Sequence, residues 1–116
     1  YDVEAIIDIY RSYGVGAHYI IDRKGKTLLL IEEKNIAYHA GVSELPDGRT
    51  KVNEVSIGIE LVANYEDGYT EAQYRALNVL IDDIRSRYDI TYVLGHSDIA
   101  PERKTDPWNF AWERVK

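Results

Sequence analysis

The sequence of 116 residues contains no cysteine and no methionine. Without cysteine, no disulfide stabilises the fold, and the redox compartment of the protein is left undetermined. Without methionine, Tyr1 is not a translation start, and we expect the natural protein to begin upstream of it. No apolar run approaches the roughly 20 residues of a transmembrane helix. Stability must therefore come from a hydrophobic core.

The chain also lacks an excess of positive charge. Fourteen lysines and arginines stand against 20 acidic residues, which gives a net charge of -6. Non-specific binding to nucleic acid or to an anionic membrane needs a basic patch, so this balance argues against both. The length indicates one domain over residues 1–116, large enough to bury roughly two-thirds of its unfolded surface. We expect a monomer.

Two segments have the apolar spacing of amphipathic helices. In residues 2–13, Val3, Ile6 and Ile7 recur at helical intervals. Residues 70–88 are the stronger prediction, because Thr70 and Gln73 form a capping-box pattern at their start. Five residues of this segment make one apolar stripe, namely Tyr74, Leu77, Leu80, Ile81 and Ile84.

Four segments are predicted as strands. Residues 17–22 and 27–31 flank a turn at Gly25, which indicates an antiparallel hairpin. The second of them is almost continuously apolar, as expected of a strand covered on both faces. Residues 91–94 form a short apolar run that indicates a buried strand.

The remaining strand prediction, residues 55–62, alternates between two faces. Val55, Ile57, Ile59 and Leu61 share one face, so Glu60 points to the other. Gly58 removes side-chain bulk beside Glu60, which lets another group approach the backbone. The preceding residues 41–54 have no periodicity and are predicted to be a long loop, and long loops in compact domains are often functional.

The segment from Gly95 to Asp106 carries the strongest chemical signal. His96 is expected at the end of the 91–94 strand, and Pro101 and Pro107 should keep the segment from becoming a helix. Imidazole nitrogen and carboxylate oxygen are both normal zinc ligands, and Lys104 precedes Asp106 by two residues. The alternative is a surface loop in which Asp106 forms turn bonds and Lys104 is solvated.

This segment, GHSDIAPERKTDP, resembles the signature loop of the zinc-dependent N-acetylmuramoyl-L-alanine amidases. That family includes AmpD-type enzymes, phage-lysozyme-type amidases and peptidoglycan recognition proteins. Residues 15–21 and 56–61 resemble two further segments of the family, in the same order along the chain. Between them stands Ala37-Tyr38-His39-Ala40-Gly41, where the family usually has Trp-His-Ala-Gly.

The resemblance implies an α/β fold with a central mixed sheet flanked by helices, and a zinc cofactor. His96 and Asp106 match two of its ligands. The third, a histidine on a strand upstream of Tyr1, matches nothing here, so we expect the 116 residues alone to bind zinc weakly. Glu60 matches the residue that transfers protons beside the metal, and Lys104 matches a lysine suited to stabilising an oxyanion.

Other residues match the family less fully. His39 is predicted either to contact substrate or to anchor its loop, and His18 to be structural. Lys51 is a candidate partner for a stem-peptide carboxylate. Ala17 stands where some phage relatives have a catalytic tyrosine, so the arrangement based on glutamate is the one this chain supports. Trp108 stands where glycine is common, a change expected to reshape the rim near the metal.

The function implied is hydrolysis of the amide between the lactyl group of N-acetylmuramic acid and L-alanine, in peptidoglycan or muropeptides. The rival hypothesis is a non-catalytic peptidoglycan-binding module, which the missing third ligand favours. Retention of Glu60, His96, Lys104 and Asp106 favours the enzyme. The cell envelope or extracellular space is the favoured location, with muropeptide recycling in the cytoplasm and phage lysis as alternatives.

Overall fold

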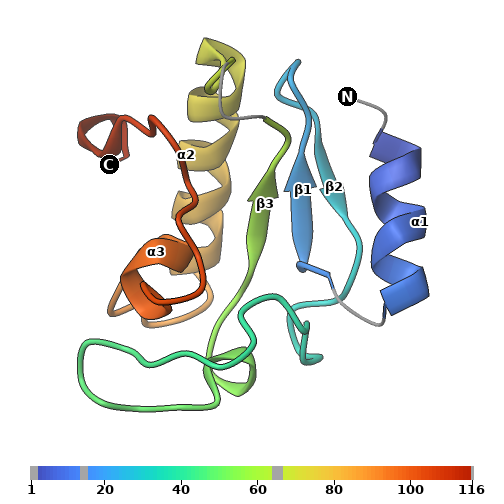
Figure 1. The fold of residues 1–116 in the computed structure, drawn as a ribbon. Helices are drawn as coiled ribbons and strands as arrows, with labels where there is room; N and C mark the ends of the chain where they lie inside the picture. Colours follow the sequence, from blue (N-terminus) through green and yellow to red (C-terminus); the bar gives the residue numbers. More distant parts are fainter. Residues whose placement is uncertain (1–2, 14–15, 64–66, 116) are drawn as a thin grey trace.

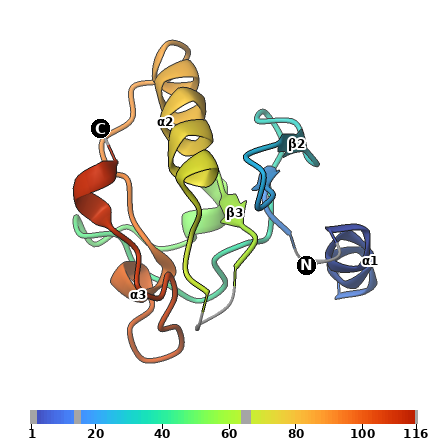
Figure 2. The same cartoon turned by 90° about the horizontal axis from the view of Figure 1, so that it is seen from above.

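The computed structural model describes residues 3–13, 16–63 and 67–115. A three-stranded sheet separates two helices, α1 (Val3–Tyr13) on one face and α2 (Glu71–Arg85) on the other (Figures 1 and 2). Asp2, predicted to begin the first helix, lies outside the described residues. No helix in this part of the chain is long and apolar enough to cross a membrane.

The sheet has the order β2-β1-β3 and mixes both kinds of pairing. β1 (Tyr19–Ile21) runs antiparallel to β2 (Thr27–Leu29) and parallel to β3 (Ile59–Leu61). The hairpin predicted around Gly25 is confirmed, and Gly25 has the positive φ of 86° that the turn requires. The prediction of an α/β fold with a central mixed sheet flanked by helices is confirmed.

α2 forms the core together with the sheet. Its predicted apolar stripe is buried throughout, and Leu77, Leu80, Ile81 and Ile84 pack in one cluster with Ile21 of the central strand. The predicted capping box is present: the Thr70 hydroxyl accepts from the Gln73 backbone N–H, and the Gln73 side chain accepts from the Thr70 N–H. The Gln73 amide nitrogen also donates to the carbonyls of Ile21 and Val62. One buried side chain thus joins the start of α2 to two strands.

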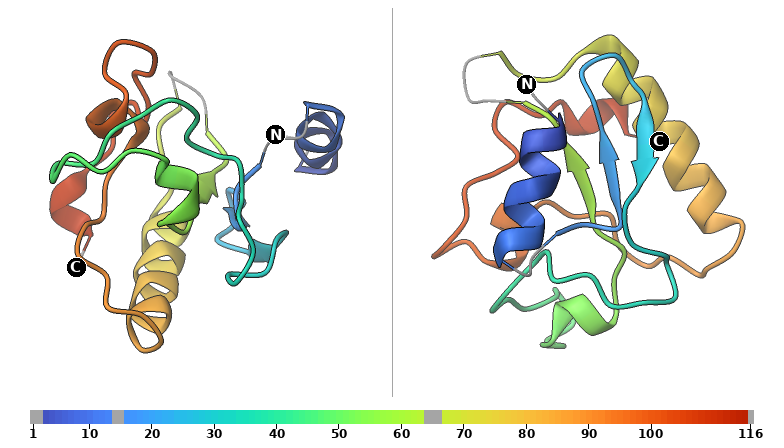
Figure 3. Two further views of the ribbon diagram at one scale, coloured as in Figure 1. Left: turned by 90° about the horizontal axis from the view of Figure 1, so that it is seen from below. Right: turned by 90° about the vertical axis from the view of Figure 1, so that its right-hand side faces the viewer.

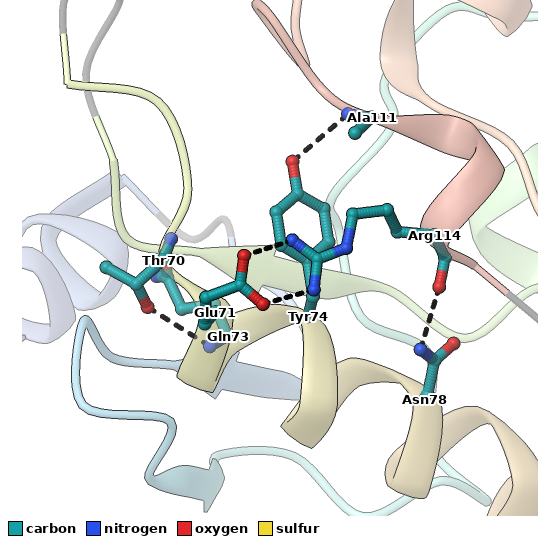
Figure 4. Close-up of polar contacts among 7 residues, drawn as sticks. All are labelled: Thr70, Glu71, Gln73, Tyr74, Asn78, Ala111 and Arg114. Carbon is teal, nitrogen blue, oxygen red and sulfur yellow. Dashed lines mark hydrogen bonds and ion pairs between the residues drawn. The ribbon is translucent and has the colours of Figure 1, made fainter.

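The C-terminal tail is tied to α2 by polar contacts that Figure 4 shows. The Arg114 guanidinium pairs with Glu71 and lies 4.5 Å from the centre of the Tyr74 ring. The Asn78 amide donates to the Arg114 carbonyl at 2.8 Å, and the Ala111 backbone N–H donates to the Tyr74 hydroxyl at 3.0 Å. The tail therefore has a fixed path beside the core.

Three strand predictions are too long, and the first of them, residues 17–22, forms a strand only as β1 over Tyr19–Ile21. β2 ends at Leu29, and its residues Thr27 and Leu29 are exposed, Leu29 by 56%, so this strand is not covered on both faces. β3 spans only Ile59–Leu61. Val55, predicted to face the core, is 51% exposed, because it directly follows the 3-10 helix η1 (Val52–Glu54).

The strand predicted at residues 91–94 is wrong. Val93 and Leu94 do pack inward, but the segment pairs with no strand among the described residues. The segment after it also differs, since His96–Ile99 forms a short helix, α3, that ends before Pro101. Gly95 is the N-cap residue of α3, and its N–H donates a hydrogen bond to the Asp98 carboxylate at 2.8 Å.

The predicted long loop crosses the end of the sheet where β1 and β3 begin, and runs past α3 (Figures 1 and 3). A second buried cluster fixes it there, in which Ala40, Leu45 and Val52 pack with Ile99 of α3. The Glu44 N–H also donates to the Ile99 carbonyl at 2.9 Å. The loop is therefore held against the element that carries His96.

Gly58 is the point where this loop reaches the sheet. A Cβ atom placed on Gly58 would lie 2.6 Å from the imidazole of His39, closer than packed atoms allow. The predicted close approach beside Glu60 is confirmed, and the approaching group is His39. Gly58 has no positive φ, so its requirement for glycine is one of space and not of backbone conformation.

We predict that Gly58→Ala destabilises the fold by about 1–3 kcal/mol, the usual cost of overpacking a tight contact. Urea unfolding in the His39→Ala background provides the control, because removing the imidazole opens the space that the new methyl group needs. There the same substitution should cost less than half as much. Equal costs in both backgrounds would show that the contact with His39 is not what excludes a side chain.

Candidate active site

The segment 95–107 folds back on itself and brings its two ends together. The Ser97 N–H donates to the Asp106 carbonyl at 2.8 Å, and the Lys104 N–H donates to the Ala100 carbonyl at 2.8 Å. Gly95 packs tightly against the Pro107 ring, where a side chain would clash. As a result Nδ1 of His96 and Oδ2 of Asp106 lie 2.7 Å apart, although ten residues separate them.

This pair has the donor types that a zinc ion takes. Both side chains remain partly accessible, at 21% for His96 and 31% for Asp106. Two ligands of one tetrahedral zinc lie about 3.3 Å apart, so a small separation of these atoms would let them share an ion. No group of three potential ligands occurs in the described part of the chain. The pair thus fits two positions of a zinc site.

Glu60 lies in the centre of β3, between Ile59 and Leu61, which pack against the core on the α2 side. Burial raises the pKa of its carboxyl group, and the nearby charge of Asp106 raises it further. The positive charges of His96 and Lys104 act in the opposite direction. The structure therefore brings Glu60 into the electrostatic field of the pair and of Lys104, and its raised pKa makes it a better proton acceptor than an exposed glutamate.

Lys104 is exposed on the loop before Asp106. The neighbouring Arg103 has a structural task, because its guanidinium donates to the carbonyls of Ala40 at 2.7 Å and Val42 at 2.6 Å. This clamp joins the Lys104 loop to the segment that carries His39. Sequence reasoning missed it, although Arg103 lies inside the signature segment, because its partners are backbone carbonyls 61 and 63 residues away.

His39 lies beside His96, with ring centres 6.4 Å apart in a stacked arrangement. Burial lowers the pKa of His39 to about 4, and the charges of His96 and His18 act in the same direction. Its Nε2 donates to the Ser56 hydroxyl at 3.0 Å, since that hydroxyl gives its own hydrogen to the Val52 carbonyl. These contacts are those of a neutral, loop-anchoring histidine, and a role in substrate contact stays a prediction.

His18 has the structural environment that was predicted. It is fully buried, its Nε2 donates to the Asn35 carbonyl at 2.7 Å, and its Nδ1 accepts from the Gly58 N–H at 3.1 Å. Lys51 is exposed at the start of η1, and no contact among the described residues joins it to the His96–Asp106 pair. Its proposed role with a stem-peptide carboxylate stays a prediction.

Tyr69 is a member of the site that sequence reasoning missed. Burial raises the pKa of its phenol to about 12, and the charges of Glu60 and Asp106 contribute to the rise. In the sequence, Tyr69 can be recognised only as the residue before Thr70, which caps the start of α2. No local sequence pattern indicates that Tyr69 experiences the charges of Glu60 and Asp106.

Comparison with known proteins agrees with this geometry. The sequence model of the N-acetylmuramoyl-L-alanine amidase family matches residues 2–109. The 1,6-anhydro-N-acetylmuramyl-L-alanine amidase AmpD of Haemophilus influenzae is 43% identical over 104 residues, which cover 86% of this chain and 56% of that protein. The chain thus spans about half the length of the curated relatives that it matches.

Solved structures give the same result. A crystal structure of an AmpD derivative superimposes with a TM-score of 0.82 at 41% identity, over 87% of this chain and 57% of the other. The Escherichia coli amidase AmiD, in complex with the substrate anhydro-N-acetylmuramic acid-L-Ala-D-gamma-Glu-L-Lys, gives a TM-score of 0.88 at 32% identity, over 99% of this chain and 52% of that one. The chain belongs to the N-acetylmuramoyl-L-alanine amidase family.

Proposed function

We propose that this chain carries the catalytic residues of a zinc-dependent amidase that cleaves the bond between the lactyl group of N-acetylmuramic acid and L-alanine. The observation that carries the proposal is the proximity of the partly buried Glu60 carboxylate, whose pKa is raised, to a zinc-type donor pair and a lysine. A module that only binds peptidoglycan has no need for the raised pKa of Glu60.

The substrate class is proposed as anhydro-muramoyl peptides. Support comes from AmiD, whose solved structure contains such a peptide and matches nearly the whole of this chain. In this proposal His96 and Asp106 are two of the zinc ligands. A bound zinc ion would polarise the lactyl carbonyl and lower the pKa of water to roughly 7.

The remaining chemistry is assigned to the protein's own side chains. The Glu60 carboxylate takes a proton from the attacking water as its oxygen bonds to the lactyl carbonyl carbon. The Lys104 ammonium stabilises the negative oxygen that develops there. Glu60 then returns the proton to the alanine nitrogen as the carbon–nitrogen bond breaks. The products are the lactyl carboxylic acid and a peptide with a free amino terminus.

The metal assignment predicts that His96→Ala strongly reduces the zinc content of the full-length protein, because one of few ligands is lost. Asp106→Ala should have the same effect. His39→Ala removes a neighbouring imidazole that is not assigned as a ligand, and should retain zinc. The measurement is metal analysis of the purified, folded proteins. Unchanged zinc in His96→Ala would contradict the assignment.

The role of Glu60 predicts that Glu60→Gln lowers kcat by roughly 10²- to 10⁴-fold, the range for general acid–base groups. Glutamine has nearly the same shape but cannot accept the proton, so KM should change little. Steady-state hydrolysis of an anhydro-muramoyl peptide measures both constants. A variant within about threefold of the wild-type kcat would remove Glu60 from the mechanism.

The role of Lys104 predicts that Lys104→Ala lowers kcat on the order of 10²-fold while zinc remains bound. Arg103→Ala is the informative comparison, because Arg103 clamps the segment that carries Lys104 and should lower both kcat and the temperature of unfolding, whereas Lys104→Ala should lower kcat alone. If Lys104→Ala instead lost its zinc or unfolded, the residue would be structural. Rates, zinc content and Tm measured on both variants separate these cases.

A further inference from the structure

In the described part of the chain, β2 has β1 on one side and no strand on the other (Figure 1). The Leu30 N–H donates to the His18 carbonyl at 2.8 Å, which shows which residues bond toward β1. Because antiparallel bonding alternates along a strand, the N–H and C=O groups of Thr27 and Leu29 point away from β1. β2 therefore presents the backbone groups of two residues to a further strand.

The side chains of Thr27 and Leu29 lie on the α2 side of the sheet. They stand opposite Ile21 and Tyr19, which pack in the cluster that α2 forms with the sheet. Both Thr27 and Leu29 are exposed, Leu29 by 56%. Thr27 also lines a hollow of about 550 Å³ between the β1–β2 hairpin and α2. The apolar side chains of this hollow are those of Ala72, Ala76, Val79 and Leu80.

This edge lacks the features that usually keep a strand from pairing with another chain. Residues 27–31 read Thr-Leu-Leu-Leu-Ile, without a charge or a proline. Lys24 and Lys26 precede this run and Glu32 follows it, and all three are exposed. The contact of Glu32 with Lys34 is an exposed ion pair, which contributes little. Two copies in antiparallel orientation would place the basic end of one beside the acidic end of the other, so the edge is complementary to itself.

We propose that two copies of the protein associate through β2, antiparallel about a twofold axis at Leu28, and form one continuous six-stranded sheet. In this register Thr27 lies opposite the partner's Leu29, and each such pair exchanges two backbone hydrogen bonds. The partner's Leu29 then lies beside Thr27 on the α2 side, over the apolar hollow, and the symmetry repeats this contact.

The dimer replaces the monomer that the sequence alone led us to expect, because only the folded structure shows that β2 is an outer strand. β2 and β3 lie at opposite edges of the described sheet. Glu60, on β3, is therefore separated from the proposed interface by β1. The inference does not rest on the proposed function, and neither experiment below measures amidase activity.

Sedimentation velocity of the full-length protein over a range of concentrations measures the association. Leu29→Lys places a charge at the apolar hollow twice in each dimer and should raise the dimer Kd more than about tenfold. Val55→Lys is the matched control, because Val55 is 51% exposed but lies outside the sheet, and it should leave Kd within about twofold. A wild-type protein that stays monomeric at every concentration, or equal Kd values for wild type and Leu29→Lys, would overturn the proposal.

Cross-linking tests the register. The 116 residues contain no cysteine, so Leu28→Cys and Leu29→Cys each introduce one. The two copies of position 28 form a non-hydrogen-bonded pair with Cα atoms about 4.5 Å apart, which a disulfide can span. The two copies of position 29 are offset along the strands, beyond the roughly 7 Å that a disulfide allows.

Oxidised glutathione should therefore convert Leu28→Cys into a covalent dimer on a non-reducing gel and leave Leu29→Cys monomeric. No cross-link in folded Leu28→Cys, or equal cross-linking in both variants, would overturn the pairing about Leu28. If Leu28→Cys failed to fold, the comparison of Leu29→Lys with Val55→Lys would still decide, because both of those substitutions are at exposed positions.

Discussion

The close packing of the His39 imidazole on Gly58 is the contact on which the geometry of the site depends. Gly58 is already bound to β1, because its carbonyl accepts from the N–H groups of His18 and Tyr19 and its N–H donates to the His18 ring. His39 adds the long loop to this point, and Ile99 and Arg103 join that loop to α3. The position of His96 relative to Glu60 is thus set by a continuous path of packed groups. Any residue larger than glycine at position 58 would displace one end of that path.

Burial of Glu60 and the positive charges near it act in opposite directions on the pKa of its carboxyl group. Desolvation is the largest influence on the Glu60 carboxyl and raises its pKa, while His96 and Lys104 partly reverse the effect. An exposed glutamate would be a weak base, and a buried one with no positive neighbours would keep its proton and be unable to accept another. The intermediate case is the one suited to proton transfer. The net charge of -6 has little influence here, because interactions with distant surface charges are screened over roughly 8–10 Å.

The sequence predicts those parts of the structure that local chemistry decides. The helix α2, its capping box and the turn at Gly25 depend on residues a few positions apart. The capping box and the turn were predicted correctly, and α2 was predicted with its start but ends at Arg85, before the expected residue 88. Residues 91–94 show the limit, because an apolar run reports burial but does not show whether a second strand is available for pairing. The same limit applies to Gly58, where the sequence predicts a close approach without identifying His39. Within the candidate site, the family motifs single out His96, Glu60, Lys104 and Asp106. Tyr69 and the Arg103 clamp depend on tertiary packing, and no motif includes their partners.

Most of the candidate site residues lie on short or irregular segments, which need an independent source of rigidity. Glu60 alone lies on a paired strand, opposite Ile20 of β1. The segment that carries His96 and Lys104 is held by the backbone bond between Ser97 and Asp106, by the tight contact of Gly95 with Pro107, and by Arg103. Each of these joins residues that are distant in sequence or that lie at opposite ends of the segment. The site is incomplete in this segment alone, because the hydrogen bonds within residues 95–107 bring His96 to Asp106 but bring neither of them to Glu60. The donor pair, Glu60 and Lys104 meet only when the core beneath them is formed, so the geometry of the candidate site and global stability are coupled in this fold.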